Sequence, residues 1–184
     1  MRPVSREEIV DYQTWEEKRP KERAAIMRLK DQRRVHVGDA LTFLFETRDT
    51  VRYQVQEMMR TEQLVREKDI VHEIETYNEL LGGPGELGCT LLIEIDDPAE
   101  RDRRLRGWKD LPRHLYVRVE GGEAIRASFD PRQVGEERLS SVQYLKFATG
   151  GRVPTAIGAD HPALGVETEL TPAQKQALAS DLAS

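Results

Sequence analysis

The sequence is poor in the residues and segments on which several classes of protein depend. A single cysteine, Cys89, excludes a framework of internal disulfides. The apolar runs are only a few residues long, far short of the about 20 residues that a membrane-spanning helix requires. Acidic residues outnumber basic ones by 33 to 28 and the two signs alternate, so no positive face is expected to neutralise phosphates. We therefore expect neither nucleic acid nor a membrane among its partners.

The N-terminal sequence MRPVSREEIVDY also lacks the apolar stretch of a secretory signal, which predicts a cytoplasmic protein. What the chain does contain is typical of a globular protein, with 38% hydrophobic and 33% charged residues. Its length suits a single domain over residues 1–184. Within that domain we expect a helical N-terminal segment at 1–34 and a C-terminal arm with a terminal helix at 150–184.

Capping signals predict where the helices begin. Four pairs have the spacing of a capping box: Ser5 with Glu8, Thr14 with Glu17, Asp97 with Glu100, and Thr171 with Gln174. Pro98 and Pro172 strengthen the last two, because proline suits the first position of a helix. The expected helices are 5–12, 20–32, 48–66, 68–82, 98–107 and 172–182.

Alternating apolar residues predict strands that pair as hairpins. One hairpin is expected around Gly38-Asp39 and a second around Gly121-Gly122. The strands of these hairpins are 35–37 with 41–45, and 115–119 with 125–129; further strands are expected near 87–95, 139–148, 153–157 and 164–169. The predicted fold class is α+β, in which antiparallel hairpins form a mixed or antiparallel sheet packed against an amphipathic helix pair and a terminal helix.

Two motifs that suggest chemistry have simpler structural interpretations. The glycine-rich stretch 82–88 leaves a helix and enters a strand, whereas a phosphate-binding loop runs from strand to helix. It therefore indicates a helix stop followed by a tight turn. Cys89 alternates with aliphatic residues, a pattern typical of a buried, inert thiol.

Histidines give little sign of a metal site. His72 and Glu75 lie one helical turn apart and are the weak metal candidates, although a solvated helix face is the default interpretation. His36, His114 and His161 are scattered singly, and His161 is expected in a surface turn.

Six polar residues are candidates for a ligand pocket between helices 48–66 and 68–82. They are Arg48, Arg52, Gln56, Glu57, Glu75 and Asn78. Arg48 and Arg52 would bind an anionic ligand, and Glu57 or Glu75 would transfer protons. Alternatively the six form a structural network, with Arg52 pairing to Glu57, Glu75 or Asn78, that braces the two helices. The sequence leaves both interpretations open.

Five segments in order, FLFETRDTVRYQVQEM, ETYNELLGGPGELG, TLLIEIDDP, RLSSVQYLKF and GADHPAL, resemble an uncharacterised bacterial family, domain of unknown function 3501. The resemblance covers nearly the whole chain. It implies no established activity, cofactor or catalytic residue. Genes of that family often lie beside genes for rubrerythrin-like proteins and iron–sulfur oxidoreductases, which implies a role in peroxide or redox metabolism.

We therefore expect a non-catalytic accessory or binding partner of a rubrerythrin-like protein and an iron–sulfur oxidoreductase. We expect no cofactor, because one cysteine cannot supply the several thiolates of an iron–sulfur cluster. The alternative is an enzyme or sensor that binds a small anionic ligand in the pocket between the two helices. A third interpretation is a homo-oligomer that associates through an uncovered edge strand.

Overall fold

The computed structural model describes all 184 residues, which form two antiparallel sheets and five α-helices. The first sheet has the strand order β1 (Arg34–Val37), β2 (Leu41–Phe45), β3 (Leu87–Ile93), β6 (Val142–Phe147), and the second has the order β5 (Ala124–Arg126), β4 (Leu115–Val119), β7 (Pro154–His161), β8 (Leu164–Glu169). The helices are α1 (Tyr12–Asp31), α2 (Arg48–Glu62), α3 (Glu67–Asn78), α4 (Pro98–Gly107) and α5 (Pro172–Leu182). Three 3-10 turns are η1 (Arg6–Glu8), η2 (Leu111–His114) and η3 (Pro131–Gln133). The predicted α+β class is confirmed.

The main core lies between the two sheets. Phe43 of β2 and Leu91 of β3 are 0% exposed, as are Val117 of β4 and Ile157 of β7, and all four belong to one apolar cluster. Leu178 of α5 joins the same cluster. The period of two that predicted the strands therefore places one face of each sheet against the other.

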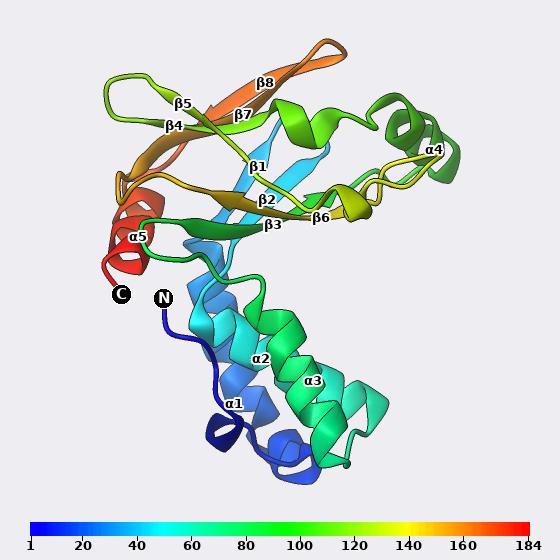
Figure 1. Cartoon of the computed structure of the whole chain (residues 1–184), viewed down its shortest axis with the longest axis vertical. Helices are drawn as coiled ribbons and strands as arrows, with labels where there is room; N and C mark the ends of the chain where they lie inside the picture. Colours follow the sequence, from blue (N-terminus) through cyan, green and yellow to red (C-terminus); the bar gives the residue numbers. More distant parts are fainter.

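The helices α1, α2 and α3 form an arm that extends away from the sheets (Figure 1). Its own apolar cluster includes Val55 and Met59 of α2 and Ile70 and Ile74 of α3. Val4 and Ile9 complete this cluster from the first ten residues of the chain, which we call the N-terminal strap (residues 1–10). None of the helices in the molecule is both long enough and apolar enough to cross a bilayer.

Both ends of a helix were predicted correctly only where a proline and a cap coincide. The helices predicted at 98–107 and 172–182 are confirmed, with Asp97 and Thr171 as caps. The helix predicted at 20–32 in fact begins at Tyr12, because Asp11 rather than Thr14 caps it and the helix continues through Pro20. The predicted helix 5–12 is only the turn η1.

The other two predicted helices end too late. The helix predicted at 48–66 ends at Glu62, because Gln63 adopts a left-handed conformation with φ of 51°. The helix predicted at 68–82 ends at Asn78, well before the glycine that was expected to stop it. Both predicted hairpins form, with φ of 63° at Gly38 and of 88° at Gly121. Positive φ is the conformation that glycine tolerates best.

Candidate functional site

The two arginines predicted to bind an anion are paired with carboxylates at the N-terminal end of the chain. Arg48 forms an ion pair with Glu8, and Nη2 of Arg52 lies 3.0 Å from Oε2 of Glu22. The predicted partners of Arg52 are wrong, because this side of α2 packs against α1 rather than α3.

Gln56 and Asn78 hold the N-terminal strap. The N–H of Val10 donates to Oε1 of Gln56 at 2.8 Å, and Nε2 of Gln56 donates to the carbonyl of Val10 at 3.0 Å. Asn78 makes the same two bonds with Val4, at 2.8 and 2.9 Å. Each side-chain amide therefore takes the place of a peptide group, and the strap is fixed across α2 and α3 without being part of a sheet.

Glu57 is bound by three donors from α1. Nε1 of Trp15 donates to it at 2.8 Å, and Arg19 donates through Nε and Nη2 at 2.8 and 3.0 Å. Burial raises the pKa of Glu57, but the hydrogen bonds from Arg19 and Trp15 outweigh it and the net pKa is lowered. A carboxylate held in its ionised form in this way is a weak proton acceptor near neutral pH.

The two remaining candidates, Glu75 and His72, lie exposed on α3. No group of three or more His, Cys, Asp or Glu side chains in the 184 residues is placed to hold a metal ion. Of the six candidate residues, only Arg52 lines one of the three main cavities of the molecule. Anion binding by the six stays a prediction, and it would require ligand to displace Glu8 and Glu22.

The largest of these three cavities lies elsewhere, where the end of α3 meets the first sheet. This junction groove has a volume of about 550 Å³. It is lined by Thr76, Tyr77, Glu79, Leu80, Cys89, Ser128, Phe129, Asp130, Gln133, Tyr144, Leu145 and Lys146. Cavities of this size with mostly apolar walls and a few polar groups are the usual sites of ligand binding.

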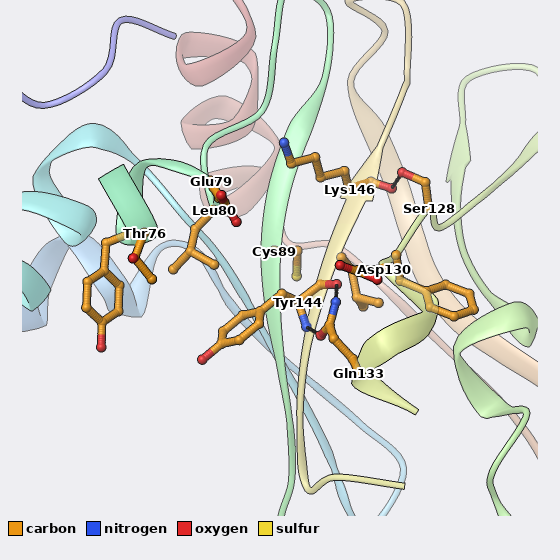
Figure 2. A pocket seen from close by; sticks show the side chains of 12 residues that line it. Thr76, Glu79, Leu80, Cys89, Ser128, Asp130, Gln133, Tyr144 and Lys146 are labelled. Atoms are coloured by element: carbon orange, nitrogen blue, oxygen red, sulfur yellow. Dashed lines mark hydrogen bonds between the residues drawn. The ribbon is translucent and has the colours of Figure 1, made fainter. Parts of the chain in front are cut away.

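Strand β6 supplies the chemically distinct side chains of the junction groove. Tyr144 and Lys146 extend from β6 toward the α3 side of the groove (Figure 2). Leu145, between them in sequence, is buried in the core beside Cys89, its register partner on β3. The period of two in SVQYLKF already predicts that Tyr144 and Lys146 lie on one face of the strand. No local feature of the sequence indicates that α3 lies against that face.

The free edge of β6 is closed by the segment on the other side of the groove. The amide of Gln133 bonds both backbone groups of Tyr144, with N–H to Oε1 at 2.7 Å and Nε2 to the carbonyl at 3.1 Å. Ser128 pairs with Lys146 through two backbone bonds of 2.8 and 2.9 Å. An added strand would find these groups occupied, so the groove can recognise a ligand only through its side chains.

The thiol of Cys89 lies at the floor of the groove and is 2% exposed. Burial, and secondarily the charge of Glu46, raise its pKa well above the usual range. Glu46 is itself buried and is bound by the hydroxyls of Thr50 and Thr90 at 2.5 and 2.6 Å. The floor is therefore an uncharged thiol, as the alternation of the strand predicted, rather than a nucleophile.

Comparison with known proteins adds a structural relative. The crystal structure of a novel protein of unknown function from Burkholderia pseudomallei K96243, at 1.90 Å resolution, is 27% identical in sequence. It is superimposed with a TM-score of 0.90 over 98% of this chain and 100% of that chain. No curated protein matches the sequence. The family described as Protein of unknown function (DUF3501) matches residues 3–182, as the sequence motifs predicted, and the chain therefore belongs to that family.

Proposed function

We propose that this protein is a non-catalytic accessory subunit in a peroxide or redox-related system, and that it binds a partner protein at the junction groove. The candidate partners are a rubrerythrin-like protein and an iron–sulfur oxidoreductase, the two partners that the resemblance to the family implies. The redox chemistry then belongs to the partner.

The observation that carries the proposal is the position of Cys89. A thiol acts in redox exchange as an exposed thiolate of low pKa, whereas Cys89 is 2% exposed and has a raised pKa. It lies beneath an open groove whose wall carries Tyr144, a tyrosine that is 43% exposed. Exposed tyrosines are enriched at protein interfaces, so the groove suits binding better than electron transfer.

The test is reconstitution with the two candidate partners from the same organism. Sedimentation velocity should detect a complex of the purified protein with at least one of them, weakened by Tyr144→Arg. The matched control is Met27→Arg, because Met27 is 39% exposed but lies on α1, outside the groove. Equal loss of binding in both variants would show that the groove is not part of the interface. No complex with either partner, or stoichiometric iron or flavin in anaerobic preparations of the protein alone, would overturn the proposal.

A second candidate function, a sensor or enzyme for a small anionic ligand, is favoured by a cavity of about 180 Å³ between α1 and α2. Arg52 and Tyr53 line this cavity, and the buried hydroxyl of Tyr53 has no hydrogen-bond partner. Arg52→Ala distinguishes the two roles of that residue. An unchanged unfolding midpoint with lost affinity for phosphate or acetate would support the ligand site, and a lowered midpoint alone would support an ion-pair brace.

A further inference from the structure

We infer that the junction groove binds a peptide segment of the partner that presents an aromatic side chain next to a carboxylate. This inference rests on the proposed function and specifies what enters the groove.

An aromatic side chain is expected in the ligand because aromatic residues line the junction groove. Tyr77 of α3 and Tyr144 of β6 line the groove together with Phe129, and Leu80 supplies aliphatic surface. Aromatic rings pack favourably against one another in offset or edge-to-face arrangements. A planar side chain entering from solvent can therefore contact ring surface from both α3 and β6.

A carboxylate is expected in the ligand because it would pair with Lys146, the one basic residue that lines the groove. Its side chain is half-buried and makes no hydrogen bond or ion pair within the chain. Of the two acidic residues in the lining, Asp130 is already bound by Arg132 through bonds of 2.8 and 2.5 Å. Glu79 is exposed to solvent and, like Lys146, forms no ion pair within the chain. Lys146 is therefore the half-buried charge of the groove that has no partner, whereas the charge of Glu79 is solvated.

Three further polar side chains of the groove are already hydrogen-bonded within the chain. Gln133 is bonded to the backbone of Tyr144, the hydroxyl of Thr76 donates to the carbonyl of His72, and Ser128 donates to the carbonyl of Lys146. Because the edge of β6 is closed, main-chain pairing with a ligand is blocked as well. Besides the hydroxyl of Tyr144, which makes no hydrogen bond within the chain, the groove offers a ligand ring packing and one charge-assisted bond from Lys146.

The openness of the groove favours a segment of a larger partner over a free metabolite. Thr76, Glu79, Ser128 and Tyr144 are all exposed, on both sides of the groove. Small-molecule sites usually bury most of the ligand surface, which this groove does not do alone. A segment carried by a partner would have its remaining surface covered by the rest of that partner.

The experiment uses three blocked dipeptides, acetyl-Trp-Glu-amide, acetyl-Trp-Gln-amide and acetyl-Ala-Glu-amide, titrated into the full chain and followed by two-dimensional NMR. The first should bind with shifts confined to the end of α3, the 128–133 segment and β6. Loss of either the carboxylate or the ring should weaken binding about tenfold, as expected for one charge-assisted bond or one packed ring.

Lys146→Met should bind the Trp-Glu and Trp-Gln peptides equally, and Tyr144→Ala should weaken both. The matched control is Lys68→Met, which removes an exposed lysine of α3 that also lacks an ion pair and lies outside the groove. Equal binding of all three peptides, shifts outside the groove, or an unchanged preference in Lys146→Met would overturn the inference. If 2-naphthoate bound as tightly as the Trp-Glu peptide, a free aromatic acid rather than a peptide would be the ligand. A partner complex that survives Lys146→Met would overturn the inference while leaving the proposed function intact.

Discussion

Asn78 and Val4 are joined by two hydrogen bonds across 74 residues of sequence, of 2.8 and 2.9 Å, so that an amide side chain of α3 pairs with the backbone of the N-terminal strap. Val4 is 3% exposed and belongs to the apolar cluster of the arm. The strap is therefore part of the arm, and Asn78 secures it at the end of α3 that borders the junction groove.

Asn78→Ala should lower the free energy of unfolding by about 1–3 kcal/mol, because the N–H and carbonyl of Val4 would lose their partners in a poorly solvated position. Urea unfolding measures the loss, and hydrogen exchange should show faster exchange in residues 1–10. The control is Gln176→Ala, which removes an exposed amide of α5 whose side chain makes no bond within the chain. If Asn78→Ala left both the midpoint and the exchange of the strap unchanged, the paired bonds would contribute nothing to stability.

Glycine at position 88 is required by the close approach of two backbones. A Cβ placed on Gly88 of β3 would lie 1.8 Å from the carbonyl oxygen of Leu80, just past α3. Gly88→Ala should therefore destabilise the protein by about 2–3 kcal/mol or more, since neither backbone can move without separating the arm from the sheet. Gly107→Ala in α4 is the matched control, because nothing lies within 4 Å of its Cβ position. Thermal unfolding should show a large drop for the first and little change for the second.

These two cases indicate what the sequence could and could not predict. The period of two correctly predicted that Cys89 is buried, and the predicted hairpins form where Gly38 and Gly121 adopt a positive φ. Each of those signals depends on neighbours in sequence. The partner of Asn78 lies 74 residues away, and the need for Gly88 arises only when Leu80 is placed against it. For the stretch 82–88 the sequence predicts a helix stop and then a tight turn. The turn forms, with the N–H of Glu86 donating to the carbonyl of Gly83, but α3 already ends at Asn78 and Gly88 is needed for the contact with Leu80.

The arrangement of the histidines could not be predicted from the sequence for the same reason. His161 was expected in a surface turn, but it ends β7, is 6% exposed and has Nε2 2.8 Å from Oδ1 of Asp110. His114, expected to be isolated, packs edge-to-face on it with ring centroids 5.1 Å apart. The spacing of histidines along the chain cannot predict that β7 and η2 bring His161 and His114 together.

Cys89 should be unreactive in the folded protein, because burial raises its pKa and shields its sulfur. A maleimide added at neutral pH should label it only as fast as the protein unfolds, as followed by intact mass. The same reagent in strong urea should label it completely, which serves as the control for reagent activity. Rapid, stoichiometric labelling without denaturant would contradict both the burial and the non-redox role proposed for this thiol.

Ionised Asp160 should stabilise the folded protein, so that the free energy of unfolding falls at acidic pH as this carboxylate is protonated. Hydrogen bonds from Arg126, at 2.7 and 2.5 Å, are the main cause that lowers the pKa of Asp160 to about 2, and His114 adds to it. Because the folded pKa lies below the unfolded value of about 3.9, the stabilisation is fully present above pH of about 4 and is lost as pH falls toward 2. The pair is half-exposed, so screening keeps the effect modest. Urea midpoints measured between these pH values should fall less steeply in Asp160→Asn than in the original protein. Asp96→Asn, which removes an exposed carboxylate without an ion pair, should keep the original slope; if both variants kept it, Asp160 would not be the group that titrates.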